Sequence, residues 1–181
     1  MKNPYLLIIT AILYLVLKGE TSLAKDSYIE ALEACKQAVK MNPDDAEAHF
    51  NLGVVYYQSD KNKEAIESFK QSIKIDPDDA AVHFNLGVVY FSIIMFKEAI
   101  ESFKQSIKIN PDYAKVYHCL GGAYGFLGMY KEEIEAYKQA IRIDPDDANV
   151  RSSLSAAYVG MNKKTLEACK QAVKINPDDA E

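Results

Sequence analysis

Residues 49–79 read HFNLGVVYYQSDKNKEAIESFKQSIKIDPDD, and most of this stretch returns 34 residues later. The segment 49–56 is repeated without change at 83–90, and the segment 63–75 at 97–109. Five of the six prolines keep the same interval of 34 residues, with a last step of 32, at Pro43, Pro77, Pro111, Pro145 and Pro177. A fixed period of this length indicates an array of one small structural unit.

Each unit carries two helical patterns separated by a polar turn. In the first pattern, one face of a helix is formed by Ala48, Leu52, Val55 and Tyr56. The segment 63–75 has a second such face, and residues 59–62 form the polar turn between them. Pro77 cannot continue the second helix, and Asp78 or Asp79 can cap the next one. The sequence therefore predicts helical hairpins that bury their apolar faces by stacking on their neighbours.

The repeat resembles the tetratricopeptide repeat, whose pattern is a large residue, Leu-Gly and Tyr in the first helix, then Ala, an aromatic residue and Pro. In the first full unit these positions hold His49, Leu52, Gly53, Tyr56, Ala65, Phe69 and Pro77. In the second they hold His83, Leu86, Gly87, Tyr90, Ala99, Phe103 and Pro111. In the third they hold Tyr117, Leu120, Gly121, Tyr124, Glu133, Tyr137 and Pro145. The fourth unit matches more weakly, with Arg151, Leu154, Ser155, Tyr158, Thr165, Cys169 and Pro177.

This resemblance covers residues 27–181 and implies an all-α fold, a right-handed α-solenoid of antiparallel helical hairpins. The expected parts are a leader at 1–24, the second helix of a partial repeat at 25–43, three full repeats at 44–77, 78–111 and 112–145, a fourth repeat at 146–177 and a tail at 178–181. Small residues at Gly53, Gly87 and Gly121 are expected where the two helices of a hairpin approach closely.

Two positions break the repeat. The turn of the second unit contains Ile94 where the third unit has Gly128, and a β-branched residue is costly in a left-handed turn. We therefore expect a changed turn geometry there, with apolar side chains near the surface. The fourth unit is two residues short between Val159 and Met161, and we expect its first helix to end at Gly160 and the last hairpin to tilt.

The first 24 residues differ in kind from the repeats. Lys2 precedes a 13-residue apolar run, Tyr5–Leu17, and small residues follow at Ser22 and Ala24. Such a run is shorter than a membrane-spanning helix and is typical of a signal peptide. A cleaved export signal, an uncleaved membrane anchor and a buried cap helix remain as alternatives. The first predicts a periplasmic or extracellular protein, the second a membrane-anchored one with membrane contact through residues 5–17.

Composition and motifs argue against catalysis and against binding to nucleic acid. The net charge is -5, and Lys and Arg are spread through the units rather than gathered in a basic stripe. The sequence has no CxxC, HExxH, calcium loop or phosphate-binding loop, and three cysteines are too few for a disulfide framework. We therefore expect a protein that is not an enzyme, with no catalytic residues, no metal site and no cofactor.

The resemblance implies a peptide-binding groove lined by the first helix of each hairpin. Carried over residue by residue, the candidate lining from the first unit is Phe50, Asn51, Val54 and Tyr57. The second unit supplies Phe84, Asn85, Val88 and Phe91, and the third supplies Lys115, His118, Cys119, Gly122 and Phe126. Aromatic residues serve both cores and interfaces, so packing against the neighbouring hairpin is the alternative for some of them. The expected function is a protein-interaction scaffold that holds a peptide or helix in this groove.

Two other functions remain open: a self-assembling array, and a fragment of a longer array that acts as an accessory subunit. Leu32–Lys40 and Leu166–Lys174 are the same nine residues, and the match resumes through Asn-Pro-Asp-Asp-Ala-Glu. A new hairpin would begin where the sequence stops at Glu181. Because solenoids normally carry a polar terminal cap, an uncapped last helix predicts head-to-tail association with another copy.

Overall fold

The computed structural model describes residues 22–175, with side chains described for residues 28–167. Over this range the chain forms the helices α2 to α9 and no strand, which confirms the expected all-α fold. The chain divides into two compact units, Met1–Ile75 and Asp76–Glu181, which are described separately. The apolar run Tyr5–Leu17 lies outside the described residues, and residues 22–24 of the expected leader open α2.

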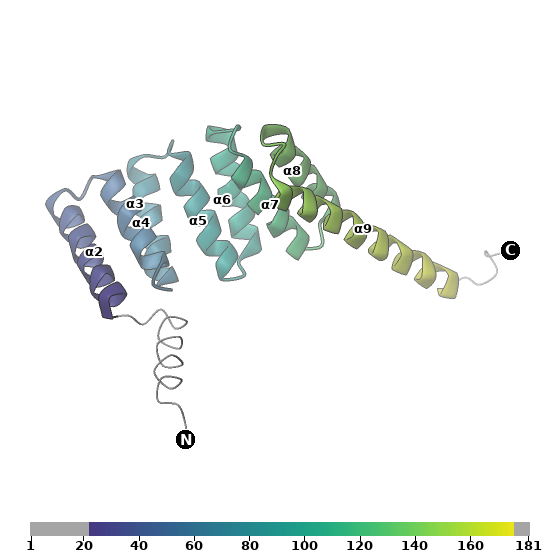
Figure 1. The fold of residues 1–181 in the computed structure, drawn as a ribbon, viewed down its shortest axis with the longest axis horizontal. Coiled ribbons are helices and arrows are strands. Elements are labelled where there is room, and N and C mark those ends of the chain that lie inside the picture. The colour runs from purple at the N-terminus through teal and green to yellow at the C-terminus, as the bar shows by residue number, and fades with distance from the viewer. Residues whose placement is uncertain (1–21, 176–181) are drawn as a thin grey trace, which may run out of the picture. The chain divides into compact units, whose positions relative to one another are not determined.

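The first unit contains three helices, α2 (Ser22–Met41), α3 (Ala46–Tyr57) and α4 (Asn62–Ile75). Helices α3 and α4 form a hairpin, and α2 packs on α3, as the purple to blue part of Figure 1 shows. Leu32 of α2 is 7% exposed. The expected second helix of a partial repeat is therefore present and covers the first helix of the next hairpin.

The second unit contains two further hairpins and a long last helix. The hairpins are formed by α5 (Ala80–Ser92) with α6 (Phe96–Ile109) and by α7 (Ala114–Phe126) with α8 (Tyr130–Ile143). Helix α6 packs on α7, and α8 packs on α9 (Ala148–Ile175). No helix within residues 22–175 is long and apolar enough to cross a membrane.

The aspartates beside each proline cap the helices, as their position predicted. Asp45 accepts a hydrogen bond from the backbone N–H of Ala48 at 3.1 Å, and Asp79 accepts one from Ala81 at 2.8 Å. These bonds satisfy backbone donors that the first turn of a helix leaves unpaired. Each hairpin therefore begins at a fixed residue, which keeps the repeats in register.

Close contact between the two helices of a hairpin depends on the predicted glycines. A Cβ atom built on Gly53 would lie 2.7 Å from the ring of Phe69, and Gly87 and Gly121 stand in the same relation to an aromatic ring of the second helix, at 2.6 and 2.5 Å. Phe69 is fully buried. The expected role of these glycines is confirmed, because a side chain there would push the ring out of the core.

The turn at Ile94 differs from our expectation. Ile94 has φ 66°, close to the 68° of Gly128 and the 58° of Asp60 in the other two turns. The same hydrogen bond closes all three turns, here from Met95 N–H to the Tyr90 carbonyl at 2.9 Å. The prediction of a changed geometry is therefore wrong: the hydrogen bonds hold the left-handed turn, and a β-branched residue occupies it at a steric cost.

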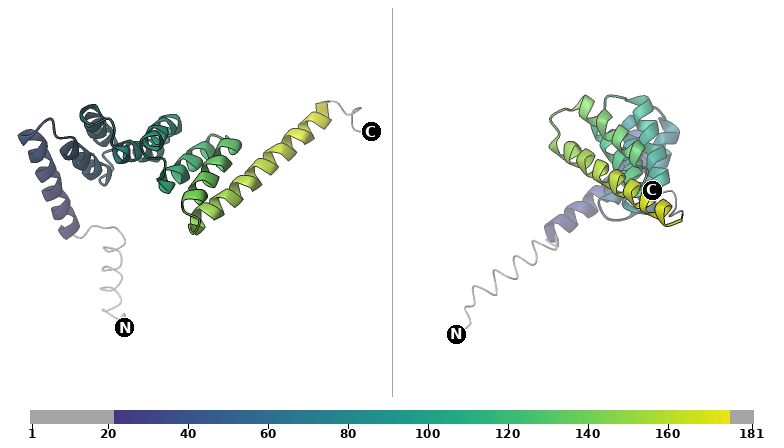
Figure 2. Two further views of the ribbon diagram at one scale, coloured as in Figure 1. Left: turned by 90° about the horizontal axis from the view of Figure 1, so that it is seen from above. Right: turned by 90° about the vertical axis from the view of Figure 1, so that its right-hand side faces the viewer.

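The fourth repeat also differs, because it forms no hairpin within the described residues. Helix α9 continues through Gly160 as one helix of 28 residues, and Figure 2 shows it running on beyond the hairpin α7–α8. The two missing residues come from the turn, and no residue of α9 has a positive φ. Gly160 serves packing instead, since a Cβ there would lie 2.8 Å from the ring of Tyr130. The expected helix end at Gly160 is wrong.

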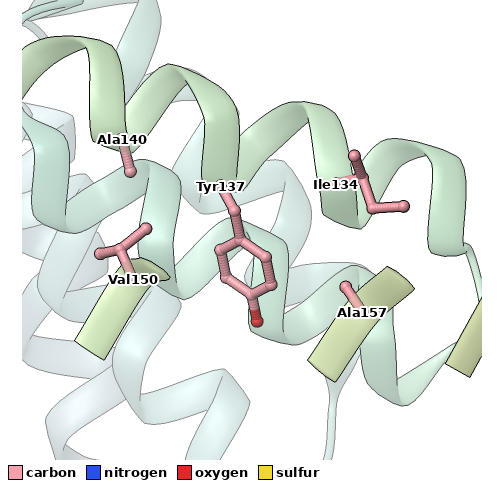
Figure 3. Packing of buried hydrophobic residues seen from close by; sticks show 5 residues of the cluster. All are labelled: Ile134, Tyr137, Ala140, Val150 and Ala157. Atoms are coloured by element: carbon pink, nitrogen blue, oxygen red, sulfur yellow. The ribbon is translucent and has the colours of Figure 1, made fainter. Parts of the chain in front are cut away.

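The first half of α9 covers α8 through a small apolar core. Ile134, Tyr137 and Ala140 of α8 meet Val150 and Ala157 of α9, as Figure 3 shows, and all five are at most 6% exposed. Partly buried neighbours pack around them at Tyr117, Ile141, Leu154 and Met161. This contact follows the general rule of the fold, in which the second helix of one repeat packs on the first helix of the next.

Candidate functional site

An apolar pocket of about 240 Å³ opens in the second unit between α5 and α7. Its walls come from the first helices of two successive hairpins and its floor from their second helices. The lining residues are Val88, Phe91, Phe103, His118, Cys119, Gly122 and Tyr137. Such a concave apolar site with few polar groups is the usual form of a ligand pocket.

The repeat itself builds this pocket. Val88 and Phe91 are three residues apart on α5, so they share a face, and His118 and Gly122 are four apart on α7. The floor consists of Phe103, which is fully buried, and Tyr137, which is 5% exposed. Their rings lie where Gly87 and Gly121 leave room, as in the first hairpin. The same residues that set the distance between helices therefore fix the depth of the pocket.

Gly122 leaves the mouth of the pocket open. A Cβ atom built there would meet the ring of Phe91 at 3.7 Å and the hydroxyl of Tyr137 at 3.9 Å, both ordinary contact distances. The corresponding residue of the second hairpin is Val88, which lies on the opposite wall. A larger side chain at position 122 would thus occupy the cavity rather than strain the backbone.

Polar groups at one side of the pocket are engaged with α9. His118 Nε2 lies 3.2 Å from the hydroxyl of Ser153, and the Tyr137 hydroxyl also hydrogen-bonds Ser153. Burial, assisted by the charge of Glu133, raises the pKa of Tyr137 to about 12, so the phenol stays neutral. Burial also raises the pKa of the Cys119 thiol, against the opposing effect of Lys115. The pocket presents neutral, weakly polar groups and no reactive thiolate.

Three of the predicted site residues, Val88, Phe91 and His118, line this pocket, as do Cys119 and Gly122 of the transferred set. Phe84 does not line it. Its ring is 6% exposed and packs against Phe103 and Tyr113, with centroids 6.0 and 5.3 Å away. Phe84 belongs to the core, which was the stated alternative for the aromatic residues.

The two polar residues predicted for the groove have partners in the structure. The Asn85 amide donates a hydrogen bond to the Ala81 carbonyl at 2.8 Å, four residues earlier on α5. Lys115 Nζ lies 5.6 Å from the centroid of the Phe84 ring, within range of a cation–π contact. Neither group lines the pocket.

Phe126 lies beyond the pocket, at the end of α7. It is 68% exposed, and its ring stacks on Phe96 with centroids 4.7 Å apart and contacts Phe91 edge-on at 5.5 Å. Phe91 thereby connects the pocket to an exposed aromatic surface at the turn. The remaining predicted residues, Phe50, Asn51, Val54 and Tyr57, lie on α3 in the first unit, where Phe50 packs on Phe69 with centroids 5.8 Å apart.

Sequence reasoning missed the pocket floor. Phe103 and Tyr137 were interpreted only as core residues of the second helix, and both are indeed buried. Their ring edges nevertheless close the pocket between α5 and α7. The available signal was the pairing of Gly87 and Gly121 with these rings, because a glycine in the first helix lets the ring behind it reach the groove.

Within the residues whose side chains are described, no three His, Cys, Asp or Glu gather as metal ligands. His49 and His83 hold equivalent places, each with Nε2 about 3 Å from a proline carbonyl six residues earlier, at 2.9 and 3.0 Å. They link the start of a helix to the turn before it.

Comparison with known proteins identifies the repeat. The TPR repeat family model matches residues 19–60, 56–93, 96–128 and 127–162, which together span most of the chain. The chain belongs to the TPR repeat family. The third and fourth matches run through α7, α8 and the first part of α9. Proteins of this family are generally protein-interaction modules.

Solved structures show the same TPR fold. Two crystal structures of MamA are 30% and 28% identical to the chain, with TM-scores of 0.73 and 0.72. They cover 86% and 94% of this chain, and 96% and 94% of their own. The first TPR of Spaghetti (RPAP3), bound to the HSP90 peptide SRMEEVD, is 21% identical over 65% of this chain and 93% of that one, with a TM-score of 0.63. No curated protein matches the sequence.

Proposed function

We propose that this TPR protein is a non-catalytic scaffold that binds an apolar segment of a partner protein in the pocket between α5 and α7. The observation that carries the proposal is the pocket itself, about 240 Å³ in volume and lined by Val88, Phe91, Phe103, His118, Cys119, Gly122 and Tyr137. A cavity of this size accommodates one large aliphatic or aromatic side chain, which would anchor the segment.

The chemistry of the groove favours an apolar anchor over an acidic tail. A carboxylate ligand requires cations or free N–H donors at the binding surface. Lys115 already lies over the Phe84 ring, and Asn85 already donates to its own helix. Cys119 and Ser153 occupy first-helix positions where a cation would be needed, and both are uncharged. The acidic peptide bound to RPAP3 therefore supports peptide binding by this fold but not the same ligand for this chain.

The exposed aromatic surface beside the pocket supports the same proposal. Phe91 forms one wall of the pocket and contacts Phe126, which is largely exposed. A bound segment that inserts one side chain into the pocket would pass over this surface with its next apolar residue. Aromatic residues of this kind commonly contribute much of the binding energy at protein interfaces.

The proposal is tested by filling the pocket. We would select binders to the full chain from a phage-displayed random peptide library and measure their affinities by fluorescence anisotropy. The variant Gly122→Leu places a side chain in the cavity, where Gly122 has open space around it. We expect it to weaken the selected peptides by about tenfold or more.

The matched control is Ala81→Leu, which adds the same side chain at an exposed position on α5 outside the pocket. We expect this variant to bind as the wild type does. Selected peptides that lack an apolar residue, or that bind Gly122→Leu with unchanged affinity, would overturn the proposal. An accessory role within a longer array stays open, and it makes the same use of the pocket.

A further inference from the structure

The distal half of α9 carries a surface that every earlier second helix covers with the next repeat. Leu32, Ile100, Ile134 and Leu166 are the same position of the repeat, once the two missing residues of the fourth repeat are counted. The first three are 7%, 8% and 6% exposed, whereas Leu166 is 56% exposed. The difference is one of context and not of chemistry, because all four are branched aliphatic residues.

The uncovered face extends along α9. Val159 lies seven residues before Leu166, two helical turns away on the same side, and it is 70% exposed. Ala157, which packs on α8, is nine residues before Leu166 and so lies half a turn round. The exposed stripe therefore faces away from the helix that holds the first half of α9.

The sequence shows what fits this face. Leu166–Lys174 is identical to Leu32–Lys40, and in α2 that segment packs on α3. In the same way α6 packs on α7 and α8 on α9. A first helix with the sequence of α3 is therefore the complement of the distal half of α9, and another copy of this chain contains one.

We infer that the distal half of α9 docks on α3 of a second copy, in the place that α2 occupies in the free chain. The exchanged contact is the same contact, made by the same nine residues, so its local free-energy change is close to zero. Association gains the apolar stripe of α9 that the free chain leaves in water, and it requires the partner's α2 to leave α3. Head-to-tail association through this contact is thus concentration-dependent.

The inference is tested by measuring the mass of the full chain by size-exclusion chromatography with light scattering, from about 1 to about 200 µM. We expect the wild-type mass to rise above that of one chain. Leu166→Glu puts a charge in the docked stripe and should weaken association by about tenfold or more. Ile94→Glu is the matched control: it changes an aliphatic residue that is 74% exposed outside α9, and it should associate as the wild type does.

A second variant reverses the sign of the effect. Leu32→Glu weakens the hold of α2 on α3 and so vacates the docking surface, which should strengthen association. The double variant Leu32→Glu/Leu166→Glu should be a monomer. A monomeric wild type, an unchanged Leu166→Glu variant, or association that persists in the double variant would each overturn the inference. The comparison of Leu166→Glu with Ile94→Glu decides the matter even if Leu32→Glu unfolds the first unit.

Discussion

The hairpins α5–α6 and α7–α8 share one plan and differ at one pair of positions. Both place a glycine of the first helix against an aromatic ring of the second, Gly87 on Phe103 and Gly121 on Tyr137. Next to this contact the second hairpin has Phe91 and Ala99, whereas the third has Gly125 and Glu133 at the equivalent positions.

The difference shows that a repeat conserves volume more strictly than chemistry. Ala99 is fully buried beside the large Phe91 ring's helix. In the third hairpin the large side chain comes from the other helix, and a Cβ on Gly125 would lie 2.7 Å from the Glu133 carboxylate. Glu133 is 8% exposed, and its Oε2 atom makes no hydrogen bond in the described structure. The space is filled, but with a buried polar group that costs stability.

The largest effect is expected when the acidic residue is moved to the second hairpin. Ala99→Glu would place a carboxylate at a fully buried position without the glycine that makes room for it. We expect this substitution to lower the free energy of unfolding by about 3 kcal/mol or more, through overpacking and burial of a charge. Urea denaturation followed by circular dichroism measures the loss.

The matched rescue is Phe91→Gly, which copies Gly125 into the same hairpin. In the Ala99→Glu background it should recover about 1 kcal/mol or more, although Phe91→Gly alone destabilises the chain by loss of the ring. A double-mutant cycle gives the coupling between the two positions. Additive effects would show that the exchange of the large residue between helices has no energetic basis.

The next largest effect concerns the charge on Glu133. Burial raises the pKa of this carboxyl above its usual value of 4.5. In acid both the folded and the unfolded states hold the proton, so the residue costs nothing as a charge. As pH rises above 4.5 the unfolded state ionises first, and stability falls until the folded carboxyl ionises as well.

We therefore expect Glu133→Gln to stabilise the chain at neutral pH, by about 1 kcal/mol, and to have little effect near pH 4. Urea midpoints of the wild type and the variant from pH 4 to pH 8 measure the difference. Exposed Glu132 on the same helix supplies the control, Glu132→Gln, which should show no such trend. A stability difference between wild type and Glu133→Gln that is independent of pH would contradict this account.

The period of the sequence carried most of the fold. The bounds of α3 and α4, the capping by Asp45 and Asp79 and the contact of Gly53 with Phe69 follow from the repeat, because each depends on local spacing. The pocket was predicted only as a set of first-helix residues. Its floor required knowledge of how deeply a ring such as Phe103 reaches between helices, and this is a property of tertiary packing.

Two errors have a common physical reason. The expected stop at Gly160 treated glycine as a helix breaker, but the contact with Tyr130 holds it inside α9. The expected distortion at Ile94 treated the residue's own preference as decisive, but the hydrogen bond from Met95 to Tyr90 fixes the turn. In both places tertiary and hydrogen-bond energy outweighs a local propensity of about 1 kcal/mol.

The smallest expected effect restores the glycine of the third hairpin's turn to the second. Ile94 has φ 66° and a side chain that is 74% exposed, so it bears the steric cost of the left-handed conformation with little packing in return. Ile94→Gly should raise the free energy of unfolding by up to about 1 kcal/mol, since relief of that cost exceeds the extra entropy of glycine in the unfolded chain. Ile93→Gly, next to it at φ -99°, should destabilise the chain instead because no strain is relieved there. Thermal unfolding of both variants distinguishes the two positions, and equal shifts in Tm would mean that the turn stores no strain at Ile94.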